Sequence, residues 1–340
     1  MHMSDALLSP SVAFAMCAAS GAAIAWSVAK IKKEELSEKK LPIMAVAGAF
    51  VFAAQMINFT IPATGSSGHI GGGILLAALL GGAPALLSIS AVLVIQCLFF
   101  ADGGLLALGS NIFNMGVIPC LFVYPLLFKP LMKRGVSSGR LTLASVASVV
   151  VALQLGAFAV VLETLTSGIT VLPFSSFVLL MQPIHLAIGL VEGLVTGAVL
   201  SFVWKMRPEI LESAESGADI PAGVSMKKVL AALAALTLVT GAVLSGFASS
   251  YPDGLEWSVM GVTGTDELEA SGPAFESAAG IQEKTAFMPD YDYAAPSDTA
   301  PISGTAAAGI IGSLMTFAAA ALIGTAISKS KKHKDAAAKA

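Results

Sequence analysis

Residues 70–101 read IGGGILLAALLGGAPALLSISAVLVIQCLFFA, an apolar run that decides how the chain crosses a membrane. As one straight helix, these 32 residues would be about 48 Å long. That exceeds the hydrocarbon core of a bilayer, which is about 30 Å thick. Gly81-Gly82-Ala83-Pro84 interrupts the run near its middle. We therefore predict a short helix, a tight turn at membrane depth and a second helix that begins at Pro84.

The rest of the chain is also strongly apolar. Its 340 residues are 56% hydrophobic and only 12% charged, which is the composition of a polytopic membrane protein. Seven further runs are long enough to cross a bilayer at about 20 residues each, and they lie near 10–30, 41–61, 107–131, 140–166, 173–205, 227–249 and 302–328. Together with the hairpin, they predict an all-α fold of about nine transmembrane helices.

Basic residues indicate the orientation of these helices. They cluster in the segments 31–40, 129–140, 205–228 and 328–340, which follow alternate crossings if residues 70–101 form a hairpin. Of the 19 Lys and Arg residues, all but Lys284 then lie on one side. Because cytoplasmic loops carry the excess of Lys and Arg, that side is expected to be cytoplasmic and the amino-terminus external.

A change in composition divides the chain near residue 206. We predict a first domain over 1–206, a polar cytoplasmic linker over 207–226, two helices within 227–328, and a basic cytoplasmic tail over 329–340. The two helices flank an external loop, 250–301, that carries ten Asp and Glu residues against one Lys. No helical or strand periodicity is evident there, so we expect a mostly flexible acidic segment that raises the local cation concentration.

The chain begins with Met1-His2, which offers three nitrogens in one chelate. They are the α-amine of Met1, the amide nitrogen of His2 and Nδ1 of its imidazole. The set is nearly planar and leaves one equatorial position open, which suits Ni(II) or Cu(II), and Co(II) less strictly. The alternative is that His2 is merely the second residue of an ordinary chain start.

A glycine-rich loop after the second apolar run contains the other candidate ligand. It reads Asn58-Phe-Thr-Ile-Pro-Ala-Thr-Gly-Ser-Ser67-Gly-His69-Ile-Gly-Gly-Gly73. Irregular backbone at membrane depth is tolerated where protein or a water-filled cavity covers it. His69 can supply the fourth equatorial nitrogen, with Asn58 and Ser67 supporting the loop; alternatively, His69 only caps the helix that follows.

Further polar residues follow the hairpin at Asp102, Asn111 and Asn114. Their side chains can hydrogen-bond a metal-ligating imidazole or brace a loop over it. A purely structural turn at Asp102-Gly-Gly is the alternative. His185 and Glu192 are seven residues apart, so one helical face can carry both. For this possible intramembrane pair, we favour a polar contact between helices over a metal role.

These motifs together resemble the CbiM/NikM family, the substrate-binding S components of energy-coupling-factor (ECF) transporters for cobalt and nickel. The matching residues are MH at the start, SGH-x-GGG, and ADGGL-x-ALG-x-N-x-x-NM, and the resemblance covers about 1–206. PDGLEW, from Pro252, resembles the PDGLE segment of NikN-type subunits, which can be fused to the S component. Family members often have Pro-Asp-Gly or Met-Glu-Gly where this chain has Ser4-Asp5-Ala6.

The resemblance implies a seven-helix S-component core with two added helices in a prokaryotic cell membrane. It also implies Ni(II) or Co(II) as the transported substrate, held by the Met1 amine, His2 and His69. The implied partners are a CbiQ/NikQ-like T component and CbiO/NikO-like ATPases. No GxxxxGK[ST] motif occurs, so this chain is expected to have no ATP site of its own.

We therefore expect a transport subunit and not an enzyme, with membrane lipid around it and no nucleic acid as a partner. Three alternatives remain open. The chain can be a stand-alone secondary metal permease, which requires coupled ionisable residues along its path, and only His185 and Glu192 qualify. It can import cobalt for cobalamin biosynthesis instead of nickel. It can also be a metal sensor or a membrane enzyme, although neither a signalling domain nor a catalytic set is visible.

Overall fold

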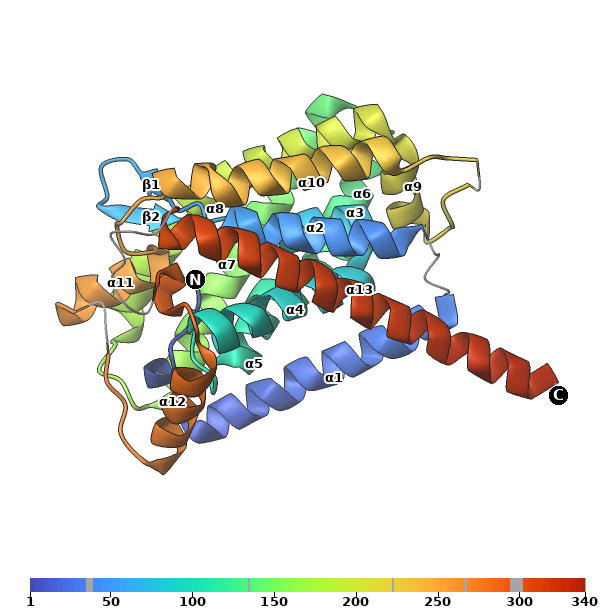
Figure 1. Cartoon of the computed structure of the whole chain (residues 1–340). Coiled ribbons are helices and arrows are strands. Elements are labelled where there is room, and N and C mark those ends of the chain that lie inside the picture. The colour runs from blue at the N-terminus through green and yellow to red at the C-terminus, as the bar shows by residue number, and fades with distance from the viewer. Residues whose placement is uncertain (35–38, 134, 222, 266–267, 294–301, 340) are drawn as a thin grey trace.

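The computed structural model describes residues 1–34, 39–133, 135–221, 223–265, 268–293 and 302–339. Its described part is a bundle of helices with one short β-hairpin at one end (Figure 1). Six helical segments are long and apolar enough to cross a membrane, judged by length and composition: Pro10–Lys33, Gly82–Phe100, Leu108–Met132, Ser138–Ser167, Phe174–Met206 and Gly304–Ser328. This confirms the prediction of an all-α polytopic membrane protein.

Every apolar run marked in the sequence contains a helix. The apolar helices are α1 (Pro10–Glu34), α2 (Lys40–Gln55), α3 (Gly73–Leu80), α4 (Gly82–Phe100), the continuous segment of α5 (Leu108–Ile112), the π-helical η2 (Phe113–Phe128) and α6 (Lys129–Met132), α7 (Ser138–Ser167), α8 (Phe174–Met206), α10 (Lys227–Ala242) and α13 (Gly304–Lys339). Among them α2, α3 and α10 have 16, 8 and 16 residues. They are too short to cross the bilayer core unaided.

The hairpin in residues 70–101 is formed as predicted. Helix α3 ends at Leu80, and α4 begins at Gly82 with Pro84 in its first turn. Gly81 between them has φ +85°, which a residue with a Cβ adopts only with strain. All eight residues of α3 are buried, so its incomplete crossing is enclosed by protein.

The predicted linker contains a helix of its own, α9 (Pro208–Ser216). It lies beneath the turn between α3 and α4. The Tyr124 hydroxyl donates to the carbonyl of Ala214 at 3.2 Å, and Lys40 Nζ donates to that of Ser213 at 3.3 Å. This helix closes the end of the bundle opposite the amino-terminus.

The acidic segment 250–301 is the main correction to the sequence analysis. The prediction of a mostly flexible loop is wrong for its described part, which contains α11 (Gly254–Thr263), α12 (Pro273–Thr285) and the 3₁₀ turn η4 (Pro289–Tyr291); residues 266–267 and 294–301 lie outside the described residues. Helix α11 begins with a capping box, in which Asp253 accepts from Leu255 and Glu256 and Glu256 accepts from Asp253. These helices pack over α4 and α8, and such tertiary contacts stabilise helices too short to persist alone.

The β-hairpin fixes the position of this segment. Strands β1 (Phe59–Ile61) and β2 (Ser66–Gly68) pair antiparallel, with Thr60 opposite Ser67. Ser67 N–H donates to the carbonyl of Pro252 at 2.8 Å, and its hydroxyl donates to that of Tyr251 at 2.7 Å. Ser67 is two residues before His69 in the chain, so these bonds hold the start of α11 close to His69.

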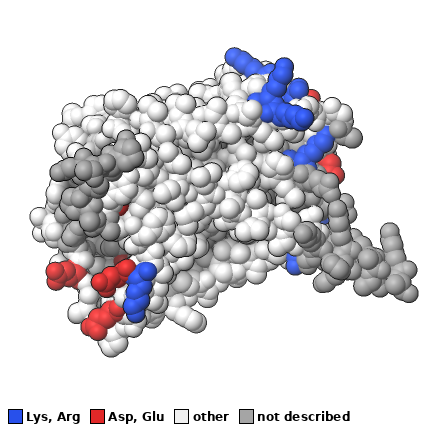
Figure 2. Space-filling model, in the orientation of Figure 1, with Lys and Arg blue, Asp and Glu red and all other residues white. Residues whose placement is uncertain are grey.

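Charged residues separate along the bundle. Figure 2 shows acidic side chains gathered at one end and most Lys and Arg at the other. The amino-terminus lies at the acidic end (Figure 1). Most Lys and Arg residues therefore lie at one end of the folded bundle, as the sequence predicts.

Candidate metal centre

The first residues of the chain enter the protein interior. The main chain of Met3 is held on both sides, because its N–H donates to Asn111 Oδ1 at 2.8 Å and its carbonyl accepts from Gly104 N–H at 2.9 Å and Asn111 Nδ2 at 3.2 Å. Met1 is only 7% exposed and Met3 is fully buried. The α-amine is therefore an interior group at a fixed position, although chain ends are usually mobile.

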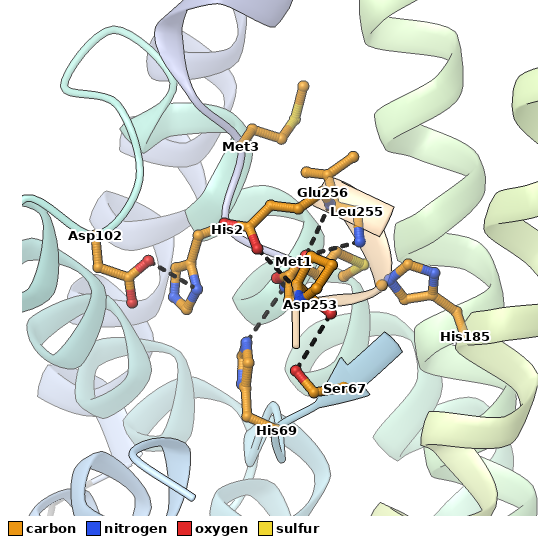
Figure 3. A network of polar contacts seen from close by, with 12 residues as sticks. Met1, His2, Met3, Ser67, His69, Asp102, His185, Asp253, Leu255 and Glu256 are labelled. Atoms are coloured by element: carbon orange, nitrogen blue, oxygen red, sulfur yellow. Dashed lines mark hydrogen bonds and ion pairs between the residues drawn. The ribbon is translucent and has the colours of Figure 1, made fainter. Parts of the chain in front are cut away.

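This placement brings the predicted ligands together. The Met1 amine donates to Nε2 of His69 at 3.2 Å, across 68 positions of sequence. The rings of His2 and His69 are stacked, with centroids 5.2 Å apart and planes at 23° (Figure 3). Among the described residues no group of three or more His, Cys, Asp and Glu side chains is placed to hold a metal.

Hydrogen bonds leave each imidazole with one free nitrogen, meaning one that carries a lone pair and no proton. Nδ1 of His69 lies 3.1 Å from the carbonyl of Ile70 and donates to it, so Nε2 keeps its lone pair. Nε2 of His2 lies 3.2 Å from Gln96 Oε1 and donates to it. The Gln96 amide is oriented by donating to Gln55 Oε1 at 2.8 Å, and Gln55 donates to the carbonyl of Gly71 at 2.9 Å. This chain of amides leaves Nδ1 of His2 as the free nitrogen.

Both imidazoles are uncharged in this environment. Burial and the nearby amino-terminal charge together lower the pKa of His2 to about 3, against the opposing effects of Asp253 and Gln96. Burial and the same positive charge also lower the pKa of His69 to about 3. A neutral imidazole is the form that binds metal ions.

An acidic partner of the amine comes from a distant part of the chain. Asp253, at the start of α11, forms an ion pair with the Met1 ammonium group, and both groups are largely buried. Burial opposes ionisation of Asp253, but the amino-terminal charge, His69 and the hydrogen bonds to its carboxylate hold its pKa below the usual range. Asp253 therefore neutralises the charge of the Met1 amine inside the protein.

Asp102 also lies at the site. Its Oδ1 is 3.3 Å from Nδ1 of His2, and its Oδ2 accepts a hydrogen bond from the Tyr291 hydroxyl at 2.5 Å. Burial raises the pKa of Asp102 against the effect of that hydrogen bond. The carboxyl group therefore contacts the nitrogen that the chelate requires, and the His2 ring must leave Asp102 to bind a metal through it.

The other predicted supporting residues contact neighbours of the two histidines and not the imidazoles themselves. Asn111 holds Met3, and Asn114 Nδ2 lies 3.1 Å from Glu163 Oε2 and 3.8 Å from the Met3 sulfur. Ser67 binds the segment that carries Asp253, and the carbonyl of Asn58 accepts from Ser249 N–H at 2.7 Å. They position the amino-terminus and the fused segment; none of these bonds reaches the two imidazoles.

His185 and Glu192 are both buried in α8, but the structure shows no hydrogen bond or ion pair between these two described residues. His185 Nδ1 donates to the carbonyl of Met181 in its own helix at 2.8 Å. Glu192 Oε1 accepts from Gly72 N–H at 2.9 Å, which connects α8 to the turn before α3. Glu192 thus forms a hydrogen bond to another element, whereas the hydrogen bond of His185 stays within α8.

Sequence reasoning did not assign Asp253, Gln96, Gln55 or Tyr291 to the site. A local signal existed for Asp253, because Asp followed three residues later by Glu256 predicts a helix start. It predicts no contact 252 residues away. Gln55 and Gln96 stand out as amides inside apolar runs, where burial demands hydrogen-bond partners.

A large cavity of about 960 Å³ leads to the centre from the acidic end of the bundle. His2 and His69 lie in its wall, together with Asp102, Asp253, Glu256, Glu276 and Asp290. Carboxylates lining a cavity attract cations. The two imidazoles are therefore reached through an acidic vestibule.

The ion pair at Met1 gives a stability prediction. Asp253→Asn keeps a good helix cap but removes the charge, so metal-free protein is expected to lose about 1.5–3 kcal/mol, the usual value of a hydrogen bond to a charged group. Because the pKa of Asp253 is depressed, its contribution is present above the ordinary Asp pKa of about 3.9 and is lost as pH falls further. Thermal unfolding of both proteins at neutral pH tests this, with the exposed Glu276→Gln as control. An unchanged midpoint would contradict the ion pair.

Comparisons with known proteins agree with this architecture. Residues 2–210 match the family model CbiM, the cobalt uptake substrate-specific transmembrane region, and residues 227–329 match the PDGLE domain. A putative fused nickel transport protein NikMN of Archaeoglobus fulgidus is 29% identical over 322 residues, covering 94% of this chain and 96% of the relative. A putative cobalt transport protein CbiM of Methanocaldococcus jannaschii is 32% identical and covers 62% of this chain and 90% of that one.

A solved structure shares its fold with about three fifths of this chain. The crystal structure of a truncated transition metal transporter aligns with a TM-score of 0.53 at 29% identity, covering 61% of this chain and 99% of that one. The family match extends over more than half of the chain and includes both histidines of the site. The chain therefore belongs to the CbiM family of substrate-specific transmembrane proteins, with a PDGLE domain at its carboxyl end.

Proposed function

We propose that this multi-pass membrane protein is the substrate-binding subunit of an energy-coupling-factor transporter that imports Ni(II) or Co(II). The ligands are the Met1 amine, the amide nitrogen and Nδ1 of His2, and Nε2 of His69. The metal is captured at the acidic end of the bundle and passed inward. ATP hydrolysis belongs to separate subunits.

The convergence of free nitrogens is the observation that carries this proposal. Nε2 of His69 lies 3.2 Å from the Met1 amine, and its ring is stacked on His2. In a planar chelate, the fourth ligand is next to the amine and next to His2 Nδ1, which is the neighbourhood that His69 occupies. The amide chain that fixes His2 leaves the required nitrogen without a proton, and Asp102 is the neighbour that a metal would displace from it.

Orientation follows from the separation of charges. The end with most Lys and Arg (Figure 2) is assigned to the cytoplasm. This puts the vestibule and the amino-terminus outside. A cysteine introduced at Ser4, which lines the vestibule, is expected to react with a membrane-impermeant maleimide in intact cells. Labelling only after the cells are permeabilised would reverse this orientation.

Uptake measurements test the function. Cells that express this chain with a T component and ATPase subunits are expected to accumulate radioactive nickel, and cells that lack the ATPase are not. Uptake that persists without the ATPase would favour the stand-alone permease. The fused nickel transport proteins among the relatives favour nickel, whereas the CbiM relatives carry cobalt in their names. The same cells given nickel and cobalt together distinguish these substrates, including cobalt import for cobalamin biosynthesis.

A further inference from the structure

A second, smaller cavity lies next to the candidate metal centre, on the side away from the vestibule. Its volume is about 40 Å³, enough for a cation with one or two waters at roughly 10–15 Å³ each. Met1, His69 and Asp253 form its outer wall, Asn114, His185 and Glu192 are its other polar lining residues, and the remainder of the lining is glycine and apolar side chains. It therefore borders the capture site on one side and α8 on the other.

Three polar atoms on the lining residues have no hydrogen-bond partner. They are Asn114 Oδ1, His185 Nε2 and Glu192 Oε2, and their residues are only 2%, 1% and 3% exposed. A buried polar atom without a partner costs about 1–3 kcal/mol. Three such atoms around one cavity in the described part of the chain indicate that water or a bound ion satisfies them.

The cavity extends toward the cytoplasmic end. Helix α8 runs from Phe174 to Met206, with Lys205 in its last turn. His185 is level with the outer wall, since a Cβ built on Gly254 would lie 3.1 Å from its Cε1. Glu192 is seven residues further along α8, about 10 Å deeper at 1.5 Å per residue.

We propose that this cavity is an inner site for the transported divalent cation, held by His185 Nε2, Glu192 Oε2 and Asn114 Oδ1 either directly or through the one or two waters that the cavity can contain. Imidazole, carboxylate and carbonyl oxygen are ligands that Ni(II) and Co(II) accept. The inner site receives the ion when it leaves the Met1 amine and His69. The inference rests on the proposed function and adds a second step to it.

A purely structural role of Glu192 is the competing explanation, because its Oε1 holds the turn after His69 through Gly72 N–H. Glu192→Gln separates the two. A glutamine oxygen still accepts from Gly72, whereas the charge that binds a cation is lost. The matched control is Glu163→Gln on α7, which replaces another buried carboxylate with one unpartnered oxygen. Glu163 does not line the cavity, and a glutamine oxygen at this position still accepts from Asn114 Nδ2.

The test uses the purified full-length chain. One equivalent of Ni(II) first fills the outer site, and Co(II) is then added as the only further metal. Bound metal is measured after equilibrium dialysis, and visible absorption reports imidazole-bound Co(II). Wild type is expected to bind a second, weaker equivalent. His185→Ala and Glu192→Gln should each weaken it by about tenfold or more and keep the first, whereas Glu163→Gln should keep both.

Two results would overturn the inner site. Wild type can bind only one metal even at high Co(II). Alternatively, the second equivalent can persist in both variants, which would assign it to the acidic residues of the vestibule. A failure of the proposed function gives a different result. If the Met1 amine, His2 and His69 do not hold the first metal, His2→Ala will still bind the first equivalent.

Discussion

Replacing His69 with alanine is expected to lower the affinity of the purified protein for Ni(II) by about 100-fold or more, since even partners outside a ligand shell alter metal affinity about 10–100-fold. In the proposed site His69 provides the fourth nitrogen, and its Nε2 lies 3.2 Å from the Met1 amine. The remaining three nitrogens hold the ion with one equatorial position open to water. Equilibrium dialysis against a competing chelator measures the change.

His185→Ala is the matched control. His185 is also a buried histidine near Met1, and it lines the inner cavity. Its Nδ1 is bonded to its own helix, so the first equivalent of Ni(II) should bind this variant with nearly unchanged affinity. Equal loss of the first equivalent in both variants would contradict the assignment of His69, because the defect would then not depend on which histidine faces the amine.

Much of the fold could be predicted because the bilayer limits the choices. A run of 32 apolar residues containing Gly81 and Pro84 has few solutions at membrane depth, and the hairpin of α3 and α4 is one of them. The contents of the polar segments were harder to predict. Helix α9 in the linker and α11 in the acidic segment are 9 and 10 residues long, and helices of that length depend on packing partners that local sequence does not name.

The candidate site likewise has one part that local sequence predicts and one part that depends on tertiary contacts. Met1-His2 is recognisable because its nitrogens are adjacent in the chain and chelate geometry is a local property. The partner of the amine, Asp253, is not recognisable, since its contact depends on β2 binding the segment before α11. The composition of residues 250–301 indicated a flexible acidic loop, but a capped helix start at Asp253 and packing of α11 against α8 order its described part.

Inserting one leucine between Met1 and His2 is expected to abolish uptake while metal binding persists. The main chain of Met3 is held by Asn111 and Gly104, so the added residue displaces Met1 outward by about 3.8 Å and leaves His2 in place. The amine then no longer lies in the same five-membered ring as the His2 amide. Leucine is chosen because a small second residue would let aminopeptidase remove Met1 and rebuild the original chelate.

The new start, Met-Leu-His, supplies four nitrogens of its own: the amine, two amides and the imidazole. Such a set suits Ni(II) and Cu(II) and leaves no equatorial place for His69. Ni(II) binding by the inserted protein is therefore expected to be the same with His69 or with His69→Ala, whereas the two differ widely in the native chain. Mass spectrometry verifies the start of each protein. Normal uptake, or binding that still requires His69, would show that the Met1 amine is not a ligand, because only its position relative to His2 has changed.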